Sequence, residues 1–308
     1  MDERLRRRAW GLTKAVGRRL RPQGDAPPRS LFILGCQRSG TTMIVEALDK
    51  DWRVKTFPEH SAVSRPAGDR RPWSVRATSR YSIRLKPLDH VAAKLERSRY
   101  PLVVLKPLVE SQKAPAILRT IDHAICLWVF RHYRDVARSN FRFFSPDVNR
   151  INLEPMIRRQ PDNWRSELVP EDVREMVARH YSPHMNPFDG GALFWYARNR
   201  LFFELNLADE ERVLALKYED LASEPERSLR RVYDIAGVPF PGRRIIEDIH
   251  PRSVGLGREL VLSPEIELAC ERVWVELNAV YEAASRHHFA EACSKMPDDP
   301  VSRVARPW

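Results

Sequence analysis

LFILGCQRSGTTMI, residues 31–44, is the stretch of sequence that decides the fold. Four apolar residues lead into Gly35, a short polar loop reaches Gly40, and the following segment has apolar residues at helical spacing. A buried strand, a glycine-bounded loop and a helix start in this order are typical of an anion-binding α/β protein, because the loop and first helical turn present free backbone N–H groups. The glycine spacing is that of a nucleotide-binding loop, but Thr41 stands where that loop carries lysine. Arg38, inside the loop, supplies the cation instead.

The composition is that of a basic protein with enough apolar residues for a large core. The chain has 308 residues, of which 43% are hydrophobic, and a formal net charge of +11. Such a charge indicates an anionic partner: a phosphate-bearing cofactor, an acidic substrate, nucleic acid or an anionic membrane surface. The four cysteines lie far apart, without the spacing of zinc ligands or of a disulfide framework. We therefore expect free, mostly buried thiols and no metal site.

The two ends of the chain differ from its middle. Residues 1–29 form a basic N-terminal extension with apolar residues at helical spacing, which fits either a solvent-exposed helix or a helix on a membrane surface. Residues 294–308 are expected to be a flexible tail. The sequence has no run of 18 apolar residues and no apolar signal region. We therefore expect a cytoplasmic protein. Peripheral contact of residues 1–29 with a membrane is the alternative.

Strands alternate with helices between these ends. The apolar runs predict strands at 31–34, 54–57, 101–106, 124–130 and 212–218. This alternation predicts a P-loop-type, three-layer α/β/α fold with a mostly parallel central sheet. We expect a single domain over residues 30–293.

Three other segments of this domain are distinctive. Residues 65–84 show little periodicity and are expected to be a long excursion over the active face, with a role in acceptor binding as one option. Residues 145–190 are polar and interrupted by prolines, and we expect a helical insertion or lid there. Residues 192–206 form an aromatic-rich helix, whose aromatic residues we expect to belong to the core.

Cationic side chains follow two of the predicted strands, at Lys106 and Arg131. Because ligands bind beyond the carboxyl ends of the strands in such sheets, we expect both to lie near the loop of residues 35–42. Ser139 follows Arg131 by eight residues, so a guanidinium and a hydroxyl can hold one phosphate from two sides. A magnesium-dependent nucleoside triphosphatase would need the loop lysine and a carboxylate after a strand. The cationic strand ends favour an anionic cofactor bound without metal.

These segments together resemble the PAPS-dependent sulfotransferase family, in its bacterial, protein-tyrosine and carbohydrate branch. GCQRSGTT, residues 35–42, is similar to the family's 5′-phosphosulfate loop, and Arg131 to Ser139 has the spacing of its 3′-phosphate motif. LKYEDL, residues 216–221, followed by a helix that stops at Gly237, resembles a downstream segment of the family. The resemblance extends over residues 31–285.

The resemblance implies 3′-phosphoadenosine 5′-phosphosulfate (PAPS) as cofactor, no metal, and transfer of its sulfuryl group to a hydroxyl, with an amine as second choice. It assigns the 5′ side of PAPS to loop residues Arg38, Ser39, Gly40, Thr41 and Thr42. It assigns the 3′-phosphate to Arg131 and Ser139. A later loop, with Arg252, Ser253 and Gly255, is expected to contribute adenine and further 3′-phosphate contacts.

Glu59 is the expected general base. It lies 21 residues after Arg38, the position of the glutamate base in the protein-tyrosine type. The small-molecule enzymes have a histidine two residues after the strand-end lysine, whereas Pro107 and Leu108 follow Lys106 here. Lys106 matches the family's second catalytic cation. His60 is the reserve candidate for the base.

The acceptor is expected to be a small molecule, a glycan or a lipid-linked compound, with a glycan, glycolipid or secondary metabolite favoured. A P-loop kinase or triphosphatase, a basic nucleic-acid-binding protein and a non-catalytic PAP-binding scaffold are the alternatives. The basic residues are spread along the chain and form no known recognition module, so no nucleic-acid partner is expected. The sequence does not indicate an oligomeric state.

Overall fold

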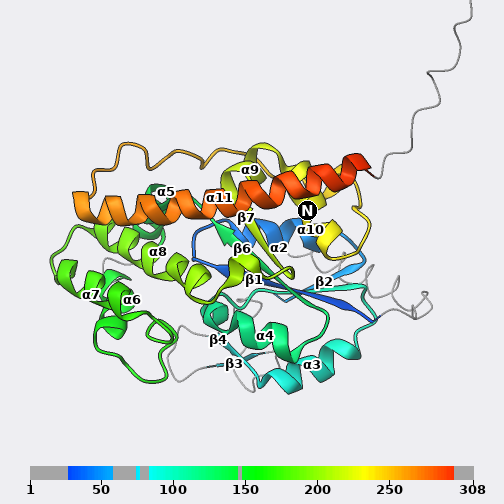
Figure 1. The fold of residues 1–308 in the computed structure, drawn as a ribbon, viewed down its shortest axis with the longest axis horizontal. Helices are drawn as coiled ribbons and strands as arrows, with labels where there is room; N and C mark the ends of the chain where they lie inside the picture. The colour runs from blue at the N-terminus through cyan, green and yellow to red at the C-terminus, as the bar shows by residue number, and fades with distance from the viewer. Residues whose placement is uncertain (1–26, 58–73, 77–82, 145–147, 295–308) are drawn as a thin grey trace, which may run out of the picture.

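The computed structural model describes residues 27–57, 74–76, 83–144 and 148–294 (Figure 1). Most of the basic extension, the tail from residue 295, and both candidate bases, Glu59 and His60, lie outside these residues. What the sequence predicts for them stays a prediction.

A sheet of five parallel strands forms the centre of the fold, in the order β2-β5-β1-β6-β7. The strands are β1 (Arg29–Gly35), β2 (Val54–Phe57), β5 (Leu102–Leu105), β6 (Ala124–Phe130) and β7 (Val213–Lys217). The first strand lies in the middle of the sheet, so the loop that follows it is flanked by the ends of β5 and β6. The predicted strands and the α/β fold are confirmed.

Both faces of the sheet are buried, which explains why the strands read as continuous apolar runs. Along β1, Leu31 and Ile33 belong to one core cluster, whereas Phe32 and Leu34 belong to the other. Successive side chains of a strand point to opposite faces, so one apolar run serves two cores. Each such fully buried side chain contributes about 1.5–3 kcal/mol to stability.

Helices cover the two faces unequally. The smaller core packs under α2 (Thr41–Asp49), α9 (Tyr218–Ser223) and α10 (Pro225–Ile235). The larger core packs under α3 (Leu88–Glu96), α4 (Ala114–Thr120), α5 (Tyr133–Phe143), α6 (Val148–Ile157), α7 (Glu171–His180), α8 (Pro187–Glu204) and α11 (Pro264–Ser294). The long α11 lies across α8 along one side of the molecule (Figure 1). Three short 3₁₀ helices complete the elements: η1 (Leu108–Lys113), η2 (Leu207–Asp209) and η3 (Arg243–Ile245).

The structure adds two short strands to the segment 65–84 and makes two helices longer than expected. A short antiparallel hairpin, β3 (Ser74–Arg76) with β4 (Ile83–Leu85), lies at the end of that excursion. Strands of three residues are too short to show an alternating pattern. The aromatic helix α8 starts at Pro187, five residues earlier than predicted, because the Asn186 side chain caps it by accepting from Phe188 N at 2.9 Å. Helix α11 continues to Ser294, the residue at which the sequence predicts that the tail begins.

Helices α6 and α7 lie in the segment 145–190, and the aromatic residues of α8 belong to the core. Phe194, Trp195 and Phe202 are each no more than 1% exposed. Cys36, Cys126 and Cys270 are free and buried, as expected.

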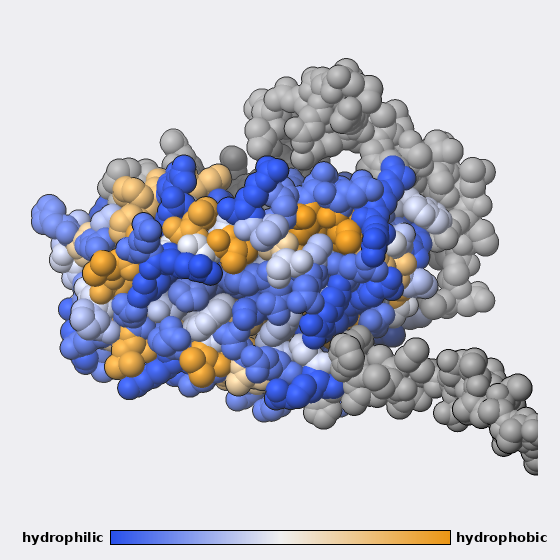
Figure 2. Space-filling view, turned by 90° about the horizontal axis from the view of Figure 1, so that it is seen from above, coloured by the Kyte–Doolittle hydropathy of each residue, from blue (hydrophilic) through white to orange (hydrophobic). Residues whose placement is uncertain are grey.

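The face that carries α11 is mostly hydrophilic, and its hydrophobic side chains form small separate groups (Figure 2). Leu268 and Val275, on α11, are two exposed apolar residues of the chain. Among the described residues no helix has the length and apolar composition needed to cross a membrane.

Candidate functional site

The loop after β1 is held tightly against its neighbours. Gly35 has φ +116°, and a Cβ there would lie 2.4 Å from the Val129 carbonyl oxygen of β6. Its N–H donates to Ser111 Oγ at 3.0 Å, which ties the loop to η1. Glycine is therefore required at this position so that β1 can end beside both neighbours.

The turn of the loop uses two further left-handed residues. Arg38 has φ +68°, a conformation that costs a non-glycine residue about 1–2 kcal/mol. Gly40, with φ +87°, precedes α2, and a Cβ there would lie 2.2 Å from the Tyr218 ring. Such a turn directs backbone N–H groups inward toward an anion. Ser39 is fully buried inside it, and its Oγ has no hydrogen-bond partner.

Arg38 reaches from the loop to α5. Its Nε donates to Ser139 Oγ at 3.0 Å, and its guanidinium lies 4.0 Å from the centroid of the Phe143 ring. Burial, and secondly the charge of Arg131, lower the pKa of Arg38. Two guanidinium groups that repel each other at one site favour the binding of an anion between or beside them.

Arg131 approaches the same loop from the end of β6. Its Nη1 donates to the Arg38 carbonyl at 3.4 Å, and its Nη2 donates to the Ser253 carbonyl. The guanidinium lies over the Tyr218 ring, 4.4 Å from the centroid. Ser139 and Arg131 thus meet at Arg38, as the eight-residue spacing predicts.

Asp135, in the first turn of α5, fixes the loop of residues 251–262 beside Arg131. Its carboxylate accepts from Gly255 N at 2.8 Å and from Gly257 N at 2.6 Å, and it lies 3.3 Å from Arg131 Nη2. A Cβ on Gly257 would lie 2.4 Å from the Arg134 backbone, so only glycine permits this approach. The late loop is therefore positioned by an acid on α5.

Lys106, at the end of β5, completes the sheet edge. It is 8% exposed, and its Nζ donates to Thr42 Oγ1 at 2.9 Å. The backbone N–H of Lys106 donates to the carbonyl oxygen of Phe57, at the end of β2, at 3.2 Å. Phe57, the last described residue before the segment that contains Glu59, therefore lies beside Lys106.

The residues around the loop fit an anionic group. Three buried side-chain atoms there have no hydrogen-bond partner among the described residues: Ser39 Oγ, Arg131 Nε and Asn140 Nδ2. All three can donate a hydrogen bond, and Asn140 is placed by its Oδ1, which accepts from Gln37 Nε2 at 3.0 Å. Buried donors normally find an acceptor, so a bound phosphate or sulfuryl oxygen would satisfy them. In the described part of the chain, no group of three or more His, Cys, Asp or Glu side chains is arranged to hold a metal ion.

The structure brings most of the predicted site residues together, but not all. The loop residues, Lys106, Arg131, Ser139 and Ser253 converge at the ends of β1, β5 and β6. Gly255 is held nearby through Asp135, whereas Arg252 is exposed and, among the described residues, has no hydrogen bond or ion pair.

Sequence reasoning missed three residues that build the site: Ser111, Asp135 and Tyr218. The four-residue spacing from Arg131 to Asp135 at a helix start was an available signal. Tyr218 lies in the segment 216–221 that carries the family resemblance, but its contacts with Arg131 and Ser253 have no local signal, and no local pattern identifies Ser111.

Comparison with known proteins agrees with this arrangement. Residues 28–242 match the model of a family described as the sulfotransferase family, so the chain belongs to the sulfotransferase family. No curated protein matches the chain significantly.

Among solved structures, the chain is similar to the sulfotransferase domain of the Synechococcus PCC 7002 olefin synthase, with 18% identity, a TM-score of 0.50, and coverage of 82% of this chain and 96% of that one. It is also similar to a sulfotransferase from Alicyclobacillus acidocaldarius, with 17% identity, a TM-score of 0.43, and coverage of 84% and 96%. Mouse SULT7A1, solved with PAP, shows 12% identity, a TM-score of 0.45, and coverage of 84% and 90%.

Proposed function

We propose that the chain transfers the sulfuryl group of PAPS to a hydroxyl of an acceptor without a metal, with an amine as second choice. The observation that carries this proposal is the contact between Arg131, the cation at the end of β6, and Arg38, the cation of the loop. Arg131 binds the Arg38 carbonyl while the Arg38 side chain binds Ser139, so the loop and the start of α5 form one cationic surface.

The donor would bind across this surface. Ser39 to Thr42 and Arg38 would hold its 5′ side through the backbone N–H groups and hydroxyls of the loop. Arg131, Ser139 and the Asp135-bound loop would hold the 3′-phosphate. When bound, PAPS supplies a sulfuryl group joined to a phosphate leaving group. Arg38 and Lys106 would stabilise the negative charge that develops on this phosphate, because fixed cations lower the barrier of such a step.

Glu59 is proposed as the general base. It follows the end of β2 by two residues, and β2 ends beside Lys106. A carboxylate there can take the proton of the acceptor hydroxyl as the acceptor oxygen bonds to sulfur and the bond from sulfur to the leaving phosphate breaks. His60 remains the reserve candidate.

The acceptor and the setting are proposed from the sequence. We propose a glycan, glycolipid or secondary metabolite as acceptor, a cytoplasmic protein, and contact of residues 1–29 with a membrane surface. We also propose that residues 145–190 act as a lid of a single domain, 30–293, followed by a flexible tail at 294–308.

Glu59→Gln tests the base. The variant should bind PAP with unchanged affinity in calorimetry and lose sulfuryl transfer to a panel of hydroxyl acceptors by at least about 100-fold, as expected for removal of a general base. Glu175→Gln, at an exposed position of α7, is the matched control and should keep full turnover. Near-normal turnover of Glu59→Gln would refute the assignment, and loss in His60→Ala alone would move the role to His60.

A further inference from the structure

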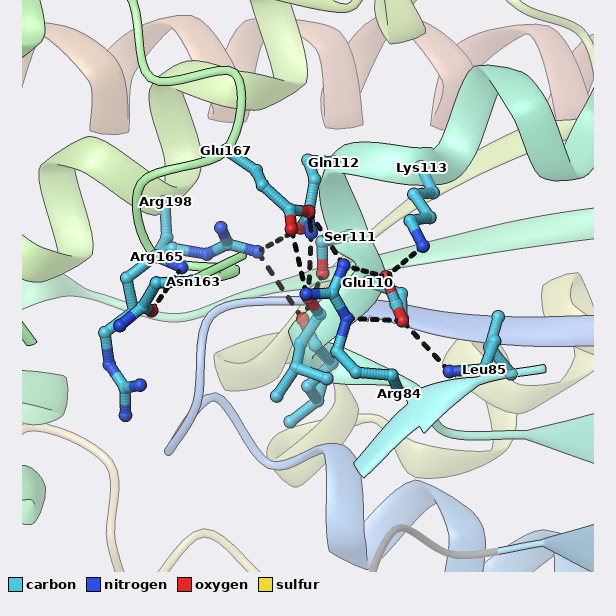
Figure 3. Close-up of polar contacts among 12 residues, drawn as sticks. Arg84, Leu85, Glu110, Ser111, Gln112, Lys113, Asn163, Arg165, Glu167 and Arg198 are labelled. Carbon is cyan, nitrogen blue, oxygen red and sulfur yellow. Dashed lines mark hydrogen bonds and ion pairs between the residues drawn. The ribbon is translucent and has the colours of Figure 1, made fainter. Parts of the chain in front are cut away.

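A second group of arginines lies beside the insertion. Arg84 is at the centre of this group (Figure 3) and is fully neutralised. Its Nε lies 2.7 Å from Glu110 Oε1, and its Nη2 lies 2.8 Å from Glu167 Oε2. These two carboxylates connect β4, η1 and the segment between α6 and α7.

Arg198 and Arg165 differ from Arg84, because neither has a carboxylate within 4.0 Å among the described residues. Arg198 is 1% exposed. In the described part of the chain its Nη2 has two acceptors, both neutral, Leu108 O and Gln112 Oε1, each at 3.4 Å, and its buried Nη1 has none. A guanidinium buried without an acid partner is expensive, and burial lowers the pKa of Arg198 to about 10.

Trp164 joins the two arginines. The guanidinium carbons of Arg165 and Arg198 lie 4.4 and 4.9 Å from the centroid of its ring. The indole Nε1 is buried, and none of the residues that the structure describes supplies an acceptor for it. Two cations lie on one ring, and the buried donor of that ring has no acceptor among the described residues, so the region is positive. The charges of Glu167 and Glu110 act on Arg198 and partly offset its charge, but within the described residues neither carboxylate forms an ion pair with it.

Arg165 is the half-buried member of this group and is held in place. Its Nε donates to Asn152 Oδ1 at 2.9 Å, and this is the only described hydrogen bond of its guanidinium. Figure 3 shows its guanidinium pointing away from the Arg84 network. Burial and the charge of Arg198 lower the pKa of Arg165 to about 10, so it is still protonated at neutral pH.

The position of this group connects it to the loop after β1. The charge of Arg198 acts on the thiol of Cys36, where it opposes the rise in pKa that burial causes. Cys36 is two residues before Arg38. Arg198 also contacts Leu108 O of η1, and Ser111 of the same η1 accepts from Gly35 N, so Arg198 lies on the η1 side of the first loop residues.

We propose that Arg165, on its Trp164 platform and with Arg198 behind, binds an anionic group of the acceptor: a carboxylate, a phosphate ester or a sulfate ester. This inference rests on the proposed function and narrows its acceptor to anionic compounds. A planar guanidinium, fixed at Nε and on one face, presents its free N–H groups to such an oxyanion in a defined direction.

The test uses glucose 6-phosphate, glucose and inorganic phosphate as probes, each titrated calorimetrically with and without saturating PAP. The wild type should bind the ester and not glucose, and Arg165→Gln should weaken ester binding about tenfold or more, as for loss of a charge-assisted contact. Trp164→Phe, which keeps the platform but removes Nε1, should weaken it less. Arg179→Gln, exposed on α7 with no described partner, is the control and should bind like the wild type.

Equal ester binding by the wild type, Arg165→Gln and Arg179→Gln would overturn the inference, as would no ester binding by the wild type. Arg165-dependent binding of inorganic phosphate that is as tight as the ester would overturn the acceptor role and identify a free-anion site. The separate PAP titration tests the proposed function. If PAP does not bind, the ester titrations of the wild type and Arg165→Gln without PAP still decide whether Arg165 binds an anion.

Discussion

Asp135→Asn is the perturbation that tests how the site is built. The Asp135 carboxylate accepts from two backbone N–H groups, of Gly255 and Gly257, and lies beside the Arg131 guanidinium. The asparagine side chain has the same shape but one acceptor oxygen. It can keep one of the N–H bonds, and its amide group opposes the other N–H or Arg131.

The expected loss follows from these contacts. A hydrogen bond to a charged group contributes about 1.5–3 kcal/mol. The variant loses one such bond, and the loop of residues 251–262 must then be ordered when PAP binds. The binding free energy of PAP should become less favourable by the same amount, about 1.5–3 kcal/mol, which lowers the affinity about 10- to 150-fold. Arg131 itself is unchanged in this variant, so the loss would report on its positioning.

Calorimetric titration with PAP measures the affinity, and thermal unfolding shows whether the variant is folded. Asp172→Asn is the control, because that residue makes an exposed ion pair with Arg200 at 3.3 Å and should change neither quantity much. A folded Asp135→Asn variant that binds PAP within about twofold of the wild type would refute the role given to this carboxylate.

Three further variants test other parts of the account. Gly40→Ala should lose PAP binding by about tenfold or more and lower the melting temperature, because its Cβ would lie 2.2 Å from the Tyr218 ring at φ +87°; unchanged binding would contradict the described loop. Burial raises the pKa of the Glu219 carboxyl in the folded protein above its pKa in the unfolded chain, which is about 4.3. The stability that this carboxyl contributes is therefore present below about pH 4.3 and is lost as the pH rises through the folded-state pKa. Glu219→Gln should therefore be more stable than the wild type at pH 7, with the difference vanishing near about pH 4; unfolding temperatures measured between these pH values check this, and a pH-independent difference would contradict it. Arg84→Met should destabilise the fold by about 3–5 kcal/mol in denaturant unfolding, because it removes a partner of the fully buried Glu110, and a loss under about 1 kcal/mol would show that Lys113 alone is sufficient.

The central sheet could be predicted from the sequence because its strands are buried on both faces. An apolar run such as 124–130, bounded by a turn and a cation, has few other interpretations. The loop of residues 35–42 was equally clear, since two glycines at fixed spacing are demanded by the backbone conformation. The order of the strands brings Lys106 and Arg131 into contact with this loop, and their roles there stay a prediction.

The parts that could not be predicted depend on contacts between distant segments. The hairpin β3–β4 has strands too short to carry a period. Asp135 joins residues 120 positions away, and its partners are backbone N–H groups that carry no sequence signal. The unpaired state of Arg165 and Arg198 is likewise visible only when α8 and the insertion are packed together.

The central claim is that this loop binds a 3′-phosphorylated adenine nucleotide without metal. Calorimetric titration of the wild type in EDTA tests it directly, with PAP compared with AMP, and with ATP and magnesium titrated in a separate buffer. The account predicts binding of PAP in EDTA at least about 100-fold tighter than AMP, because Arg131 and Ser139 meet only the 3′-phosphate. Equal affinities for PAP and AMP, or binding of ATP only when magnesium is present, would contradict it.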